Sequence, residues 1–122
     1  RTDAATDRLA QAEANKLMRA IMRFMADYDL MLCPMMPIGP LVSSHGFDTP
    51  DAKKYPNWWD WTPFTWPFNL TRSPAASVPW GLAGDGLPRA VQIVAPHFRE
   101  DTIYRAAAVL ERAMPRPVPK GW

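Results

Sequence analysis

The chain has 122 residues and a formal net charge of +2, from 14 basic and 12 acidic residues. A hydrophobic content of 48% and six tryptophans argue against a disordered chain and indicate one ordinary domain or part of a larger one. Basic residues form no block, and no apolar run is long enough to cross a bilayer. We therefore expect neither nucleic acid nor a membrane as a partner.

The single cysteine, Cys33, excludes an internal disulfide framework and a cysteine zinc cluster. A chain with one cysteine and no disulfide framework fits a reducing compartment, and we expect a cytoplasmic protein. The first residues, RTDAATDRLAQ, are polar and open a helix, which is not the pattern of a signal peptide. The lack of a starting methionine indicates a processed or cut chain.

Two long helices and one short helix are predicted. Residues 6–28 form an amphipathic pattern, with Thr6 or Asp3 able to cap its start. Residues 100–114 form the second long helix, with acidic residues in its first turn. Within 62–71 we expect a short helix, capped by Thr62 and limited by Pro67.

Three strands are predicted, near residues 29–33, 75–80 and 89–95. The run at 29–33 has the length and composition of a strand buried on both faces. The turn residues Gly84-Asp85-Gly86 join the other two into an antiparallel hairpin. The third is an interior strand whose one polar side chain, Gln92, must find hydrogen-bond partners. Residues 35–61 are predicted to be an irregular loop that ends in three tryptophans.

Few side chains offer catalytic chemistry. Ser43-Ser44-His45-Gly46 places hydroxyls beside an imidazole, but no glycine-rich turn supplies an oxyanion hole, so a polar loop is the alternative. Lys53 and Lys54 indicate a solvated surface.

Isolated polar side chains give no second site. His45 and His97 have no carboxylate at metal-ligand spacing, so no metal site is expected. Asp60 is either a partly desolvated carboxylate that binds a cation or a positive substrate group, or an exposed loop acid. Cys33 is either a pocket residue or a buried structural thiol.

The order of several motifs along the chain is a more specific signal than these isolated side chains. The run YDLMLCPMMP is followed by FTWPFNLTRSPAASVPWGLAGDGLPRAVQIVA and then by the helix EDTIYRAAAVLE. From about Ala12 to Glu111 this order resembles the C-terminal part of the amidase signature family. The positions that match the family's motifs are Pro67, Asn69, Pro74, Ala75, Val78, Pro79, Gly81, Asp85, Gly86, Leu87, Pro88 and Gln92. Arg72 and Ala90 depart from it, because each stands where the family usually has glycine.

The resemblance implies an α/β fold: the C-terminal part of an α/β/α sandwich around a mixed sheet. It implies hydrolysis of carbon–nitrogen amide bonds through a serine acyl-enzyme, without metal or cofactor. The catalytic Ser-Ser-Lys set of the family has no match in this chain, so we expect the segment alone to be inactive. The expected partners are the N-terminal portion of the amidase, or a second copy of this chain, and a small amide substrate.

The resemblance also implies roles for particular residues. Candidates for the substrate-pocket wall are Cys33, Trp61, Thr62, Phe64 and Trp66, and Asn69 and Gln92 are expected to be structural hydrogen-bonders. Relatives that bind amino-acid-like substrates carry an acid near Thr62, so its absence favours an apolar or aryl amide. The alternatives are a non-catalytic partner or scaffold module derived from the same fold, and a small α/β domain that resembles the family by chance.

Overall fold

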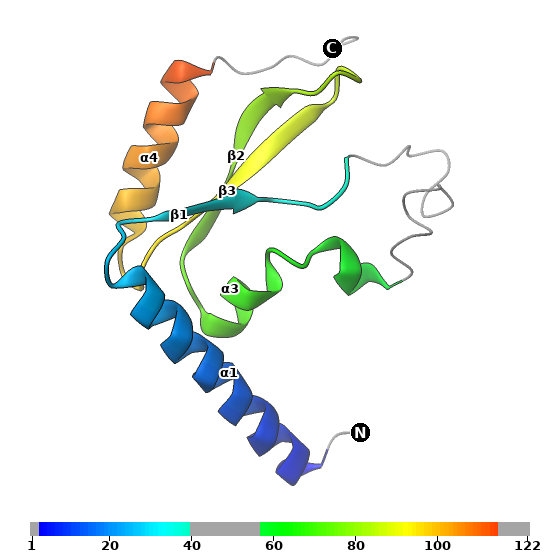
Figure 1. Cartoon of the computed structure of the whole chain (residues 1–122), viewed down its shortest axis with the longest axis vertical. Helices are drawn as coiled ribbons and strands as arrows, with labels where there is room; N and C mark the ends of the chain where they lie inside the picture. The colour runs from blue at the N-terminus through cyan, green and yellow to red at the C-terminus, as the bar shows by residue number, and fades with distance from the viewer. Residues whose placement is uncertain (1–2, 40–56, 115–122) are drawn as a thin grey trace.

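The computed structural model describes residues 3–39 and 57–114. Within them a three-stranded antiparallel sheet has the order β1-β3-β2, with helices around it (Figure 1). The elements in chain order are α1 (Ala4–Met25), β1 (Met31–Pro34), the 3-10 helix η1 (Trp58–Trp61), α3 (Trp66–Thr71), β2 (Ala75–Leu82), β3 (Pro88–Val94) and α4 (Glu100–Ala113). The predicted α/β class, with three strands, two long helices and a short helix, is confirmed.

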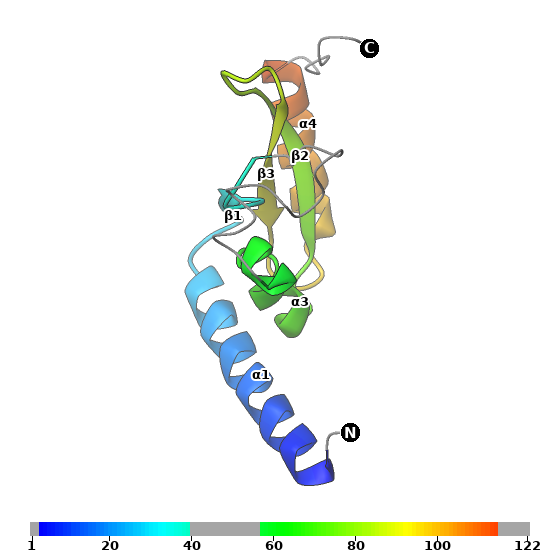
Figure 2. The same cartoon turned by 90° about the vertical axis from the view of Figure 1, so that its right-hand side faces the viewer.

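Helix α1 begins after a side-chain cap. Asp3 Oδ1 accepts a hydrogen bond of 2.7 Å from the backbone N–H of Thr6, and this bond is the main cause that lowers the pKa of Asp3. The helix ends at Met25, three residues before the predicted end. Its N-terminal half projects beyond the sheet (Figure 2), and residues 3–13 are all exposed. Only the C-terminal half of its apolar stripe therefore packs within the described chain.

Strands β2 and β3 form the predicted hairpin. In its turn Gly86 has φ 78°, and Asp85 Oδ1 accepts a hydrogen bond of 2.9 Å from the Leu87 N–H. The register shifts once: Pro79 pairs with Ala90 and Gly81 pairs with Arg89, which leaves Trp80 as an extra residue. At this β-bulge the backbone adopts φ 130° at Gly81, a value that strains residues with a side chain and therefore favours glycine.

The hydrophobic core lies between the hairpin and α4. Its buried members are Val78, Ile93, Ala95 and Ile103. Helix α4 contributes Ile103 and, at the next turns, the partly buried Ala106, Ala107 and Leu110. As predicted, β3 is the interior strand, with β1 and β2 on either side.

Two predicted features are wrong. Strand β1 was expected to be buried on both faces, but it lies at an edge of the described sheet and Leu32 is 51% exposed. Pro67 was expected to limit a helix that started near Thr62. Instead α3 starts at Trp66 with Pro67 in its first turn, where the missing N–H is not needed.

The predicted loop over 35–61 also contains regular structure at its end. Residues 58–61 form η1, where the Asp60 carboxylate accepts hydrogen bonds from the Asn57 backbone N–H (3.3 Å) and side-chain amide (3.1 Å). Among the residues described, no helix has the length and apolar character needed to span a membrane.

Candidate functional site

A groove of about 380 Å³ lies beside the end of β1. Three parts of the chain form it: the segment that follows β1, the end of η1 and the start of β3. The lining side chains are mainly apolar, and Trp61 among them is only 8% exposed. The lining residues are Met35, Met36, Ile38, Gly39, Trp61, Pro88, Arg89 and Ala90.

The charged group in this lining is already paired. Arg89 Nη2 lies 2.7 Å from Asp85 Oδ2, and the guanidinium lies so near Gly39 that a Cβ there would be 2.9 Å from Nη2. The Leu87 N–H, and then Arg89, lower the pKa of Asp85, which favours its charged carboxylate. The groove therefore offers apolar surface beside a neutralised cation, which suits an uncharged apolar group.

Gln92 lies next to this groove on the same face of β3 as Ala90. Its side chain is buried, with 3% of its surface exposed. Nε2 donates hydrogen bonds to the backbone carbonyl oxygen of Phe64 (2.8 Å) and to Cys33 Sγ (3.0 Å). Because a carbonyl oxygen can only accept, the Phe64 contact fixes which end of the amide carries the N–H groups.

The five predicted pocket-wall residues are not all in one place. Trp61 lines the groove, whereas Cys33 lines a second, shallower hollow of about 320 Å³ with Trp80, Ala90 and Val91 among its neighbours. Ala90 lines both hollows.

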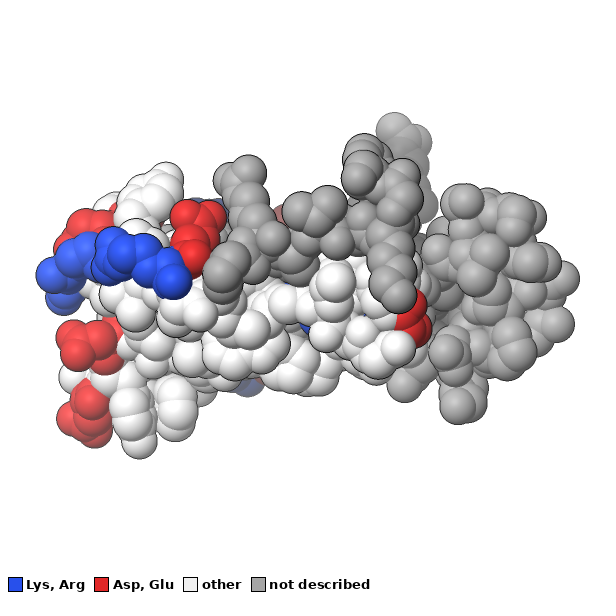
Figure 3. All heavy atoms as spheres, turned by 90° about the horizontal axis from the view of Figure 1, so that it is seen from above, with Lys and Arg blue, Asp and Glu red and all other residues white. Residues whose placement is uncertain are grey.

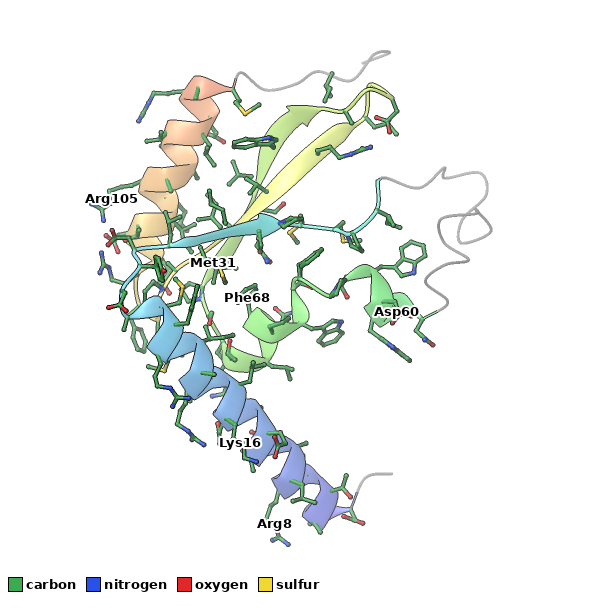
Figure 4. All side chains as sticks on the ribbon, in the orientation of Figure 1. Arg8, Lys16, Met31, Asp60, Phe68 and Arg105 are labelled. Carbon is green, nitrogen blue, oxygen red and sulfur yellow. The ribbon has the colours of Figure 1, made fainter. Side chains whose placement is uncertain are left out.

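The remaining three pocket-wall residues continue the chain from Trp61 toward α3. Thr62, Phe64 and Trp66 are half-buried, and Thr62 Oγ1 donates to the Trp59 carbonyl oxygen at 3.4 Å. In Figure 4, Asp60 and Phe68 mark the two ends of this segment, which runs alongside the strand that carries Met31.

Other predicted positions are accounted for differently. Asn69 is exposed on α3, so its role as a structural hydrogen-bonder stays a prediction. Asp60 is half-buried and caps η1, so it is not the exposed loop acid. His97 Nε2 lies 2.9 Å from the Thr71 carbonyl oxygen. Ser43, Ser44, His45, Lys53 and Lys54 lie outside the described residues.

Sequence reasoning missed most of the groove. Met35, Met36 and Arg89 lie inside the runs that carry the family resemblance but match none of its motif positions, and Ile38 lies outside those runs. It did single out Arg72 and Ala90. Arg72 adopts φ 57° and ψ 29° at the end of α3, the left-handed conformation that glycine would favour. Over the described ranges no cluster of His, Cys, Asp or Glu could hold a metal ion.

Comparisons with known proteins give one consistent result. A family model described as Amidase matches residues 1–104. The chain is 52% identical over 52 residues (43% of this chain, 10% of the relative) to the 6-aminohexanoate-cyclic-dimer hydrolase of a Pseudomonas species. It is 34% identical over 102 residues (75% of this chain, 20% of the relative) to the acylamidase of Rhodococcus erythropolis.

A solved structure has the same fold. The crystal structure of a glutamyl-tRNA(Gln) amidotransferase subunit from Thermotoga maritima superposes with a TM-score of 0.76 and 27% identity. The match covers 91% of this chain and 23% of that one. The chain thus spans between 10% and 23% of the length of these relatives.

Proposed function

We propose that this chain, which belongs to the amidase family, forms part of an enzyme that hydrolyses carbon–nitrogen amide bonds. The family match over residues 1–104 is the observation that carries the proposal. The reaction passes through a serine acyl-enzyme, whose activated nucleophile and oxyanion hole must both be present for amide hydrolysis. The Ser-Ser-Lys catalytic residues lie outside this chain, which alone is inactive. The reaction needs no cofactor.

The contribution of this chain is a wall of the substrate pocket. The wall comprises Cys33, Trp61, Thr62, Phe64 and Trp66, and the groove beside Trp61 holds the apolar part of the amide. Two features support this assignment: the lining is mainly apolar, and the nearby Arg89 is neutralised by Asp85. The substrate is therefore a small amide with an uncharged alkyl or aryl group.

The partner of this chain is the N-terminal portion of the amidase. Large apolar side chains are exposed on several elements, among them Phe24 on α1, Leu32 on β1 and Tyr104 on α4. In the view of Figure 3, acidic and basic side chains mix at the α4 end, while the described surface beside it is largely uncharged. Such a surface favours association, either with the rest of the enzyme or between two copies.

Sedimentation equilibrium tests this association. We expect the isolated chain to form dimers or larger species and to bind a dye specific for exposed apolar surface. A monomer that binds no dye would contradict the expected partner.

The free thiol of Cys33 supports a cytoplasmic location for the enzyme.

The alternative is a non-catalytic partner or scaffold module, and the exposed apolar side chains would serve it equally well. Activity separates the two. The complete protein that carries this segment should hydrolyse an anilide such as a nitroanilide, and a serine-directed phosphonate should label a serine outside residues 1–122. A complete protein that neither hydrolyses anilides nor reacts with the phosphonate would favour the scaffold module.

A further inference from the structure

The two hydrogen bonds of the Gln92 amide reach residues just before and just after two of the segments that line the groove. The side formed by Met35, Met36 and Ile38 begins two residues after Cys33, whose Sγ accepts from Gln92 at 3.0 Å. The side formed by Trp61 lies three residues before Phe64, whose carbonyl oxygen accepts from the same Nε2 at 2.8 Å. Cys33 is also the cross-strand partner of Gln92 in the β1–β3 pairing, so the sheet itself holds that side, and the Phe64 bond connects the segment after Trp61 to β3.

We propose that Gln92 is a positioning residue that sets the width of the groove and thereby the size of the acyl group that the amidase accepts. This inference rests on the proposed function, because it takes the groove as part of the substrate pocket. Gln92 acts through Cys33 and Phe64 and itself touches neither the reacting bond nor the nucleophile.

Three observations support a role beyond filling the core. The two partners of the amide are 59 and 28 residues away in sequence: Cys33 lies opposite Gln92 on the paired strand β1, and Phe64 lies in the segment between η1 and α3. The amide is buried, so water cannot replace either bond without opening the wall. The position next along the same face, Ala90, lies in the groove itself.

The test replaces the amide by an apolar side chain of similar length. In the complete amidase, Gln92→Met removes both donors while keeping most of the volume. Kinetics are measured with anilides whose acyl groups run from acetyl to octanoyl. We expect KM to rise for the long acyl groups with little change in kcat, and the preference among chain lengths, as a ratio of kcat/KM values, to change about tenfold.

A matched control separates positioning from stability. Thr102→Val also removes a buried polar group. The Thr102 hydroxyl lies on α4, away from the groove, and accepts hydrogen bonds from the side chains of Arg99 and Arg105. The variant should leave the preference for chain length unchanged. If Gln92→Met lowers kcat/KM by the same factor for every acyl group, as a purely structural variant would, the proposal is overturned.

Two further measurements apply if the methionine variant folds poorly or if the complete protein hydrolyses no anilide. Gln92→Glu keeps one donor only while the introduced carboxyl is protonated, so the wild-type preference should return as the pH falls. Hydrogen exchange needs no substrate: the Thr65 and Trp66 N–H groups, which both bond to the Thr62 carbonyl oxygen, should exchange faster in either variant. Unchanged exchange at residues 62–66 would overturn the proposal, and lack of activity alone would overturn only the proposed function.

Discussion

The side-chain nitrogen of Gln92 lies 2.8 Å from the backbone carbonyl oxygen of Phe64, 28 residues earlier in the chain. This bond connects the interior strand of the sheet to the segment between η1 and α3, which has no strand partner of its own among the residues described. The bond therefore helps to fix the position of that segment, which follows directly after Trp61, the last residue of η1.

Gln92→Leu should destabilise the protein. The substitution leaves the Phe64 carbonyl oxygen without its donor, and a buried unsatisfied acceptor costs about 1–3 kcal/mol. Denaturant unfolding of the complete protein measures the change. Glu111→Gln is the control, because Glu111 is exposed on α4 and its replacement should alter the unfolding free energy by less than about 0.5 kcal/mol. Equal midpoints for Gln92→Leu and the wild type would contradict the structure around Gln92.

Arg72→Gly should stabilise the protein by about 1 kcal/mol, because Arg72 adopts the left-handed conformation that costs side-chain-bearing residues this amount. Arg72→Ala is the matched control: it removes the same charge but keeps the Cβ, so no gain is expected. Thermal unfolding of both variants gives the comparison. An equal gain from alanine would mean that the charge of Arg72, and not its backbone, is unfavourable.

Gly81→Ala should destabilise the hairpin by about 1–3 kcal/mol, because φ 130° at the bulge is accessible to glycine and strained for alanine. A new Cβ would also lie 3.3 Å from Met114 Cε. Gly84→Ala is the control, since a Cβ there meets no atom within 4 Å and the residue has no positive φ. Unfolding free energies that are the same for both variants would argue against the bulge.

Local sequence patterns were sufficient for part of the fold. The Gly84-Asp85-Gly86 turn predicted the hairpin, and acidic residues beginning at Glu100 predicted the start of α4. The resemblance to the amidase signature family, built on motif spacing, is confirmed by the family match. The hairpin turn and the start of α4 depend on interactions between residues close in sequence. The family resemblance depends on the order and spacing of motifs, which can be read from one sequence.

The errors have a different origin. A proline can limit a helix or occupy its first turn, and composition alone did not decide between these roles for Pro67. The apolar run at β1 gave no sign of its edge position, which depends on which strands pair with it. The groove is lined by both Met36 and Arg89, residues more than 50 positions apart, so no periodic pattern marks it.

The most direct test of the central claim is anilide hydrolysis by three samples: the isolated chain, the complete protein, and the complete protein with Ser43→Ala and Ser44→Ala. We predict no turnover by the isolated chain, because the proposed function places the activated nucleophile and the oxyanion hole outside it. The complete protein should be active, and the double variant should retain its rate within a few-fold. Turnover by the isolated chain that disappears with the double substitution would contradict the account and place the active site at the Ser43-Ser44-His45 cluster.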